Sequence, residues 1–323
     1  MSRCFSPLKA TRTEEGIKFN LDGSNLSLPC GQCLGCRFQK AEAWTVRIIH
    51  EAQQHDTNSF ITLTYHDDNL PHNGSLAFDD VTKFFKRLRK SLSGKKISYY
   101  YCGEYGENFS RPHYHICLFG HDFSNDRLPH RQTDTGTVYR SSHLEKLWTH
   151  GFSEIGNLEY DSARYVAGYV QKKVTGKAAP EHYRKYDQTT GEILDITPEQ
   201  ARMSRRPAIG LNWITEYTSD VYNEDFVAIN GKKLKTPAYY DKWLEKNNPK
   251  LYEQIKQTRE QSMIGNNQLT QDDLTRMYEV RHILNSKSRT LEGEPAHSPD
   301  SNLLEYLKNQ KHYLHYEMEK AKK

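Results

Sequence analysis

RPHYHICLFG, residues 111–120, places two histidines two positions apart at the start of an apolar run. Its aromatic and β-branched residues predict a strand over residues 113–119. On a strand, residues two positions apart point to the same face, so the imidazoles of His113 and His115 project side by side. The opposite face carries the expected core residues Tyr114, Ile116 and Leu118. Neutral imidazoles are good metal ligands, so the pair is a candidate metal site, although such pairs also occur without a ligand.

A carboxylate ends the preceding predicted strand, ISYYYCGE at residues 97–104. If the two strands form a hairpin, Glu104 lies beside the histidines. Two imidazoles and one carboxylate make a site with open positions, which suits Mg²⁺ or Mn²⁺ when phosphate completes the shell, and Zn²⁺ also fits chemically. Such an ion would polarise a phosphoryl oxygen and orient the scissile bond. Glu107 is the competing carboxylate, but it stands in the turn.

Helical and strand patterns alternate on both sides of this hairpin. Apolar residues at helical spacing predict helices over 38–54, from Asp79 or Asp80 to Leu92, over 142–148 and over 162–174. Further strands are predicted over 60–65 and 152–159. The order α, β, α, β, β, α, β, α predicts an α+β fold, a central antiparallel sheet with helices packed on one face.

The other segments carry weaker patterns. Residues 1–36, punctuated by Cys and Gly, indicate a compact irregular segment, residues 120–142 a loop and residues 176–200 a polar excursion. A hairpin is predicted over 227–237, with Asn230-Gly231 at its turn. Beyond it, helical stretches are expected near 238–260, 270–285 and 301–322.

Composition and charge limit the class of protein. Hydrophobic residues make up 36% of the 323 residues, and no apolar stretch approaches the roughly 20 residues that cross a bilayer. The N-terminal MSRCFSPLKA lacks the apolar run of a secretory signal, so a cytoplasm is the expected compartment. The net charge of +4 does not by itself indicate nucleic acid. One short stretch is strongly basic, and it is either a phosphate-binding face or a solvated helix face: Lys83, Lys86, Arg87, Arg89, Lys90, Lys95 and Lys96.

Two tyrosines, Tyr165 and Tyr169, stand four positions apart in a predicted helix and therefore share one helix face. A tyrosine can attack a phosphodiester to give a covalent phosphotyrosine. Its phenol is protonated at neutral pH, so it needs a metal or a cation nearby. Two lysines lie about a turn beyond the second tyrosine: Lys172 and Lys173. Core packing is the alternative, although two small residues between the tyrosines leave room for a ligand: Ala167 and Gly168.

Four of the six cysteines lie near the start of the chain: Cys4, Cys30, Cys33 and Cys36. In a reducing cytoplasm they are not expected to form disulfides. The C-x-x-C-x-x-C sequence supplies three thiolates at metal-ligand spacing, and Cys4 would be the fourth ligand of a structural zinc site. Iron–sulfur ligation uses similar spacing, and free reduced cysteines are the further alternative.

Three segments in order, FITLTY at 60–65, RPHYHICLFG at 111–120 and YVAGYVQKK at 165–173, resemble the HUH endonucleases that start rolling-circle replication. Within that group, the chain is most similar to the replication initiators of gokushovirus-type (Microviridae) single-stranded DNA bacteriophages. The phage resemblance covers roughly residues 1–215 and rests on the paired tyrosines and three further segments: PCGQCLGCR at 29–37, GEYGE at 103–107 and RRPAIGLNWI at 205–214.

The resemblance implies a domain order and a fold. A Cys-rich segment at 1–37 would precede an HUH endonuclease domain at 38–215, whose sheet is a relative of the ferredoxin-like fold. Residues 216–323 would form a mostly helical C-terminal extension. The protein would be an endodeoxyribonuclease and DNA strand transferase.

The resemblance also implies roles for the candidate residues. His113 and His115 would bind the metal, with Glu104 as the third ligand. The two tyrosines would be alternating nucleophiles: one cleaves the origin to leave a free 3′-OH and a 5′-phosphotyrosine, and the other cleaves after one round of synthesis before the ends are joined. Single-tyrosine relatives carry a lysine three positions after the tyrosine, which favours Tyr169 with Lys172, and Lys173 is the other candidate.

The implied partner is single-stranded DNA at the replication origin, in the cytoplasm of the host bacterium, with no membrane involved. No helicase-type phosphate loop is visible in the sequence, so unwinding would come from a host helicase and synthesis from a host polymerase. Three other interpretations stay open. A phosphodiesterase that uses water would form no covalent adduct, and a non-catalytic zinc-containing protein would bind DNA without cutting it. A transposase with the same core is the third, and the phage-like flanking segments disfavour it.

Overall fold

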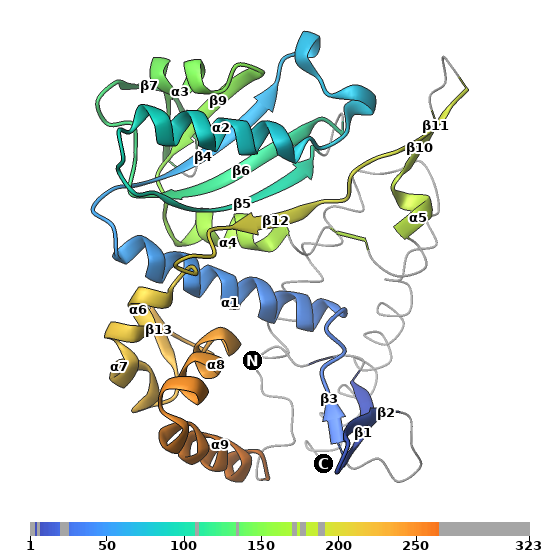
Figure 1. Ribbon diagram of the computed structural model, residues 1–323, viewed down its shortest axis with the longest axis vertical. Coiled ribbons are helices and arrows are strands. Elements are labelled where there is room, and N and C mark those ends of the chain that lie inside the picture. The colour runs from blue at the N-terminus through green and yellow to red at the C-terminus, as the bar shows by residue number, and fades with distance from the viewer. Residues whose placement is uncertain are drawn as a thin grey trace, which may run out of the picture. The chain divides into compact units, whose positions relative to one another are not determined.

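A seven-stranded antiparallel sheet lies at the centre of the structure, a computed structural model (Figure 1). The structure describes residue 4 and residues 7–19, 26–106, 110–133, 136–169, 173–174, 179–186 and 191–264. The strand order is β12-β5-β6-β4-β9-β8-β7. Their bounds are β4 Asn58–Tyr65, β5 Ser98–Tyr105, β6 Pro112–Phe119, β7 Arg127–Thr133, β8 Gly136–Ser141, β9 Gly151–Gly156 and β12 Gln200–Met203. The α+β class and the central antiparallel sheet are confirmed.

Strands β4, β5, β6 and β9 lie where the sequence predicts them, whereas the prediction of a loop over 120–142 is wrong. That segment forms the hairpin of β7 and β8. The strand β7 is exposed along most of its length and pairs only with β8 in the described residues, so no alternation of apolar residues marks it. Pro129 stands at the irregularity in the pairing, where a missing N–H costs no ladder bond.

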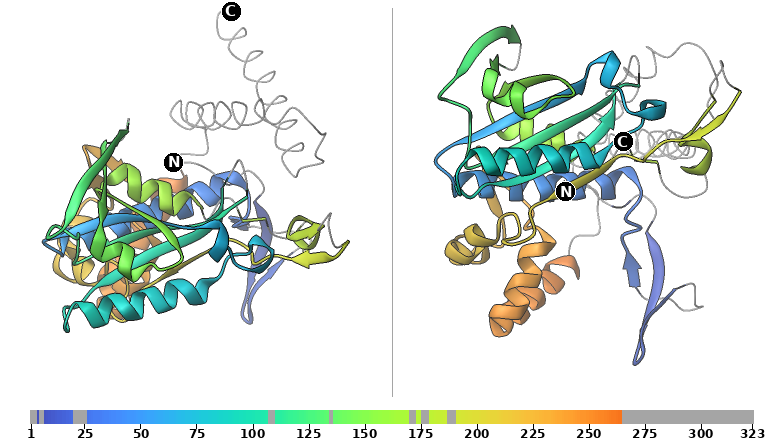
Figure 2. Two further views of the ribbon diagram at one scale, coloured as in Figure 1. Left: turned by 90° about the horizontal axis from the view of Figure 1, so that it is seen from above. Right: turned by 45° about the horizontal axis from the view of Figure 1, so that its top comes forward.

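Helices cover both faces of the sheet, so the prediction of helices on one face is wrong (Figure 2). One face packs against α2 (Phe78–Ser91) and α3 (Ser142–Leu147). The other packs against α1 (Leu34–Gln53) and α4 (Tyr160–Gly168). The run Ile-Cys-Leu-Phe at 116–119 supplies both cores because a strand buried on both faces is apolar without alternation.

The predicted amphipathic helix after residue 79 is α2. Its buried stripe consists of Phe78, Val81, Phe84, Phe85 and Leu88. Asp79 and Asp80 lie in its first turn and Arg89 and Lys90 in its last, which is the charge order that the helix dipole favours.

A small three-stranded sheet precedes α1, so the prediction of an irregular segment over 1–36 is wrong. Its order is β2-β1-β3, with bounds β1 Leu8–Thr13, β2 Gly16–Phe19 and β3 Leu26–Leu28. The strands are short and largely exposed, which is why no hydrophobic periodicity predicts them.

Residues after the large sheet form a helical layer on α1. It comprises α6 Leu211–Glu216, α7 Thr218–Tyr222, α8 Ala238–Asn247 and α9 Pro249–Ile264, with a hairpin of β13 Val227–Ile229 and β14 Lys232–Leu234. The hairpin prediction is confirmed, since Asn230 and Gly231 both have positive φ at its turn. The boundaries predicted after residues 37 and 215 stay predictions, and the helices predicted at 270–285 and 301–322 lie outside the described residues.

The segment predicted as a polar excursion contains a helical turn and a hairpin: α5 Ala179–His182, β10 Arg184–Tyr186 and β11 Ile193–Asp195. Within the part of the chain that the structure describes, no helix has the length and apolar character needed to span a membrane.

A buried histidine joins the helical layer to α1. His50 is 1% exposed, its ring stacks on Trp213 with centroids 3.4 Å apart, and its Nδ1 lies 2.9 Å from the Tyr240 hydroxyl. Burial lowers the pKa of His50 to about 3. Because the folded state binds fewer protons than the unfolded state, this stabilisation is complete above about pH 6.5 and is lost as the pH falls towards 3.

We therefore expect acid to destabilise the wild-type protein more than His50→Gln. Between about pH 6 and 4, the unfolding free energy of the wild type should fall more steeply, by up to about 1.4 kcal/mol per pH unit. Urea unfolding at several pH values measures the slope, with His72→Gln, at an exposed position, as the control. Equal slopes for wild type and His50→Gln would contradict this account.

Candidate active site

The pairing of β5, β6 and β4 brings the predicted metal ligands together. Glu104 on β5 lies opposite His113 on β6, so the predicted hairpin is confirmed. On the other side of β6, the strand β4 places Thr62 opposite His115 and Thr64 opposite His113. The two imidazoles share the sheet face that α1 and α4 cover, and their rings are nearly parallel, with centroids 6.4 Å apart.

Polar contacts fix the orientation of both imidazoles. Nδ1 of His113 lies 2.6 Å from the carbonyl oxygen of Arg111, to which it donates. Nδ1 of His115 lies 3.1 Å from the Thr62 hydroxyl, and its Nε2 lies 2.9 Å from Oε1 of Glu104. Outer contacts of this kind orient histidine ligands in metal sites. The Thr62 hydroxyl can donate or accept, so it supports either neutral tautomer of His115.

The environment of these ligands is dry. Glu104 is 4% exposed and His115 7%, whereas His113 is half-buried. Burial lowers the pKa of His113, which keeps the ring neutral and able to act as a ligand at neutral pH. Among the described residues, only the four N-terminal cysteines form a group of three or more His, Cys, Asp or Glu with ligand atoms within 4.8 Å of one another. His113 therefore stands further from the close pair of His115 and Glu104.

Arg111 holds the loop that supplies the carbonyl for His113. Its guanidinium donates to the backbone oxygen of Tyr65 at 3.0 Å and pairs with Asp67. The sequence did not predict Arg111 or Thr62 as part of the site, because a backbone carbonyl and a cross-strand hydroxyl become visible only once the register is known.

Helix α4 carries both candidate nucleophiles to the histidines. The ring of Tyr165 lies 5.2 Å from that of His115, and the ring of Tyr169 lies 5.3 Å from it, centroid to centroid. The two phenol rings are 4.6 Å apart in an edge-to-face arrangement. Tyr165 is 50% exposed and Tyr169 only 5%. Both tyrosines therefore share one helix face, as their spacing predicts, and that face is turned to the histidine side of the sheet.

The buried phenol of Tyr169 is held in its protonated form. Burial, followed by the negative charge of Glu104, raises the pKa of Tyr169 well above its ordinary value. The Tyr169 hydroxyl donates a hydrogen bond to the Glu104 carboxylate. An attack by this oxygen thus needs a group that takes the proton and a positive charge that stabilises the anion.

The helix α4 is shorter than predicted. It ends at Gly168 rather than near residue 174. Ala167 is buried among residues that pack on α1, whereas a Cβ built on Gly168 would meet nothing within 4 Å. Only Gly168 therefore leaves the room that the sequence suggested for both. Lys172 lies outside the described residues, and Lys173 lines a surface hollow with Pro180 and Tyr183.

The predicted basic cluster lies on the other face of the sheet. It belongs to α2 and the turn after it, and α2 covers the face that carries Tyr114. Several of its members have structural partners: Lys83 is 3.6 Å from Asp80, and Arg87 donates to the carbonyl of Leu147. A phosphate bound at the histidines would therefore not meet this cluster, and the solvated helix face is the better interpretation.

Exposed aromatic side chains lie on the histidine face. Phe152 on β9 is 54% exposed, its ring lies 5.7 Å from that of His66, and it stands opposite Thr64 in the sheet. Beside it, Glu154 pairs with Arg131 of the β7–β8 hairpin at 2.8 Å. Sequence reasoning missed Phe152, since a lone Phe in a strand usually belongs to the core.

Comparison with known proteins relates the whole site to one family. The family model of replication-associated protein ORF2 matches residues 58–174, which include every described residue of the site. The chain is 33% identical to replication-associated protein VP4 of Bdellovibrio phage phiMH2K over 261 residues, covering 76% of this chain and 78% of the relative. It is 33% identical to replication-associated protein ORF2 of Spiroplasma virus 4 over 274 residues, covering 75% and 80%. It is also 30% identical to replication-associated protein ORF4 of Chlamydia phage 1 over 244 residues, covering 71% and 57%. No solved structure matches.

Proposed function

Since the chain belongs to the family of bacteriophage replication-associated proteins, we propose that it starts rolling-circle replication by nicking single-stranded origin DNA with a tyrosine. The observation that carries this proposal is the position of two phenols on the ring of His115, beside the carboxylate of Glu104. Core packing alone does not account for it, because Tyr165 is half exposed and its neighbours are polar.

A divalent ion is part of the proposal, and the donor set fits it. His113, His115 and Glu104 offer two neutral imidazoles and one carboxylate, with Nδ1 of each ring already engaged. Mixed nitrogen and oxygen ligands with open positions suit Mn²⁺ or Mg²⁺. When bound, the ion would polarise a phosphate oxygen and reduce the charge that opposes attack.

The side chains of this protein supply the covalent chemistry. The Tyr169 oxygen forms a bond to phosphorus, the bond from phosphorus to the 3′ oxygen breaks, and that oxygen leaves as a 3′-OH after it takes a proton. The Glu104 carboxylate accepts the hydrogen bond of the Tyr169 phenol, so it is the group placed to take the proton of that phenol. The product is a 5′-phosphotyrosine and a primer end for a host polymerase.

Two tyrosines permit a second transfer without dissociation. Their rings are 4.6 Å apart, so one phosphate position is within reach of both. After a round of synthesis, Tyr165 attacks the regenerated origin and the released 3′-OH attacks the first phosphotyrosine, which joins the ends. Lys172 or Lys173 would stabilise the developing charge, and a host helicase would unwind the template in the bacterial cytoplasm.

A single assay tests this function. The protein is incubated with labelled single-stranded origin DNA and Mn²⁺, and the products are separated on a denaturing gel. We expect a labelled species that migrates with the protein, plus a free 3′-OH fragment. Cleavage without that species would indicate a phosphodiesterase that uses water, and binding without cleavage would indicate a non-catalytic DNA-binding protein. Either result would contradict the proposal.

The exposed Phe152 is expected to stack on a base of the bound strand. Stacking on an aromatic side chain contributes about 1–3 kcal/mol per base, so Phe152→Ala should weaken single-strand binding by roughly 5- to 150-fold. Fluorescence anisotropy with labelled DNA at constant salt measures this loss. Tyr186→Ala is the matched control, because Tyr186 is an aromatic residue, 68% exposed, on the separate β10–β11 hairpin. Equal effects at both positions would contradict a specific role for Phe152.

A further inference from the structure

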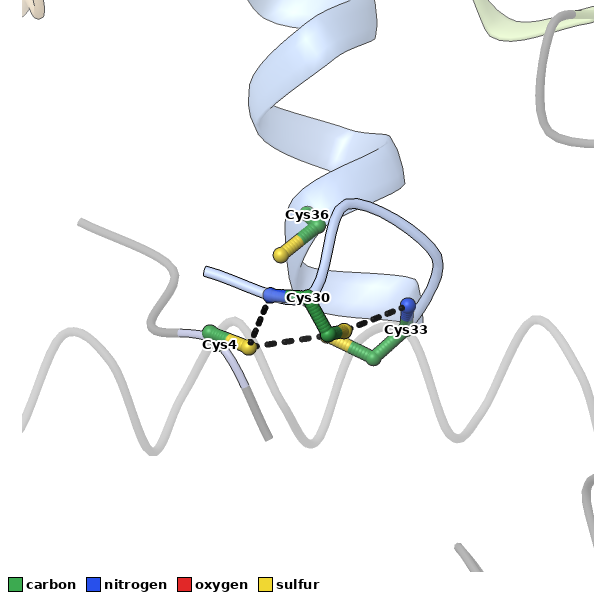
Figure 3. A group of neighbouring side chains, drawn as sticks. All are labelled: Cys4, Cys30, Cys33 and Cys36. Atoms are coloured by element: carbon green, nitrogen blue, oxygen red, sulfur yellow. Dashed lines mark hydrogen bonds between the residues drawn. The ribbon is translucent and has the colours of Figure 1, made fainter. Parts of the chain in front are cut away.

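We propose that Cys4, Cys30, Cys33 and Cys36 bind a structural zinc ion that clamps the small N-terminal sheet to the start of α1. The four sulfur atoms all lie within 4.8 Å of one another (Figure 3). The side chains come from two places far apart in sequence and turn towards one another at the first turn of the helix. This site lies apart from the candidate active site and does not depend on the proposed nuclease activity.

The spacing of the sulfur atoms fits one tetrahedral ion. With a zinc–sulfur bond of about 2.3 Å, two ligands of a tetrahedral site stand about 3.8 Å apart. The sulfurs of Cys4 and Cys33 are 3.7 Å apart. That separation is far longer than a disulfide bond of about 2.05 Å, and all four residues are free cysteines.

Backbone amides already support the thiolates. The amide of Cys30 donates to the sulfur of Cys4 at 3.2 Å, and the amide of Cys33 donates to the sulfur of Cys30 at 3.3 Å. Such bonds stabilise the negative charge of metal-bound sulfur. Cys33 is also the N-cap residue of α1, yet its side chain makes no capping bond. The positive end of the 20-residue helix lies beside the sulfurs and further favours thiolates.

The small sheet needs such a clamp because it has almost no core of its own. In β1 to β3, Ala10 is the one buried hydrophobic residue among those described, whereas Leu8, Ile17 and Phe19 are 44%, 46% and 51% exposed. A sheet this small is marginal without packing partners, and small units commonly use a metal in place of a core. Cys4 precedes β1 and Cys30 follows β3, so one ion closes the base of the sheet.

The geometry favours a single ion over the other interpretations. An iron–sulfur cluster places several iron and sulfide atoms between the thiolates, which would hold the four sulfurs further apart than one ion does. Tetrahedral thiolate ligation by a single ion is the coordination that zinc adopts in structural sites.

The first measurement is the metal content of the full chain, purified without chelators and analysed by mass spectrometry. We expect one zinc ion per chain in the wild type and in Cys117→Ala, a control that removes a buried thiol outside the cluster. Cys30→Ser should lose most of this zinc. Wild-type protein without zinc, wild-type protein loaded with iron instead, or Cys30→Ser with its zinc intact would overturn the proposal.

A second measurement separates loss of the ion from loss of the fold. Hydrogen exchange of the wild type is compared before and after zinc removal with a chelator. We expect faster exchange over residues 8–19 and 26–33, while β4, β5 and β6 stay protected. Unchanged exchange in the small sheet would overturn the clamp. If Cys30→Ser does not fold, the wild type refolded with Co²⁺ gives the decisive signal: thiolate-to-cobalt absorption is expected, and its absence would overturn the site.

Discussion

Replacing both Tyr165 and Tyr169 with Phe is expected to abolish the covalent link between the protein and single-stranded origin DNA. Only a phenol oxygen can form the bond to phosphorus, and both candidate oxygens lie at the ring of His115. Removal of an enzyme nucleophile lowers the rate by orders of magnitude, so adduct formation should fall by more than about 1,000-fold. Phe keeps the ring contacts, so the fold and DNA binding should persist. Quantitative denaturing gels with labelled DNA measure the adduct.

The single variants and one control sharpen this result. Tyr169→Phe is expected to reduce the first cleavage more than Tyr165→Phe, because the Tyr169 hydroxyl donates to Glu104. Tyr160→Phe removes a hydroxyl from the first residue of the same helix and should leave the adduct unchanged. An adduct at full yield in the double variant would exclude this tyrosine pair.

Replacing His115 with Ala is expected to cause the second largest loss. This ring contacts Glu104, Thr62 and both tyrosine rings, so its removal takes away a ligand and the surface on which the phenols lie. Loss of an outer partner of a metal ligand costs about 10- to 100-fold in metal affinity or activity, and loss of the ligand itself should cost more. Nicking rates measured against Mn²⁺ concentration report both effects.

Controls distinguish a lost ligand from a damaged fold. His113→Ala removes a half-buried ring and should reproduce the defect with less structural cost. His130→Ala, at an exposed position of β7, should nick normally. Binding of single-stranded DNA should be largely retained in the His115 and His113 variants. Normal nicking by His115→Ala and His113→Ala, or a loss of binding in parallel with nicking, would contradict the assigned role.

The central strands were predictable because burial on a sheet face leaves a regular pattern. Glu104 and the two histidines could be related from sequence since a short hairpin fixes which residues face each other. The β7–β8 hairpin was not predictable, because its side chains are mostly exposed and carry no periodic signal. The second helical face was missed for a related reason: the continuous run at 116–119 does not state which partners cover each side.

The supporting residues of the site escaped the sequence because their roles depend on tertiary register. Thr62 acts through a cross-strand contact to His115, and Arg111 acts through its carbonyl and its contact to Tyr65. The basic stretch on α2 misled in the opposite direction. Its charges stand close together in sequence, but the helix places them across the sheet from the histidines. Local charge density thus predicts a surface but not the face of the sheet on which that surface lies.

The most direct test of the central claim is to identify the amino acid that carries the DNA. The covalent adduct is digested with trypsin and nuclease, and the modified peptide is sequenced by mass spectrometry. Cleavage after Arg164 and Lys172 isolates residues 165–172, which contain both candidate tyrosines. We predict a 5′-phosphonucleotide on Tyr169 or Tyr165 within that peptide, and a nucleotide attached at any other residue would contradict the account.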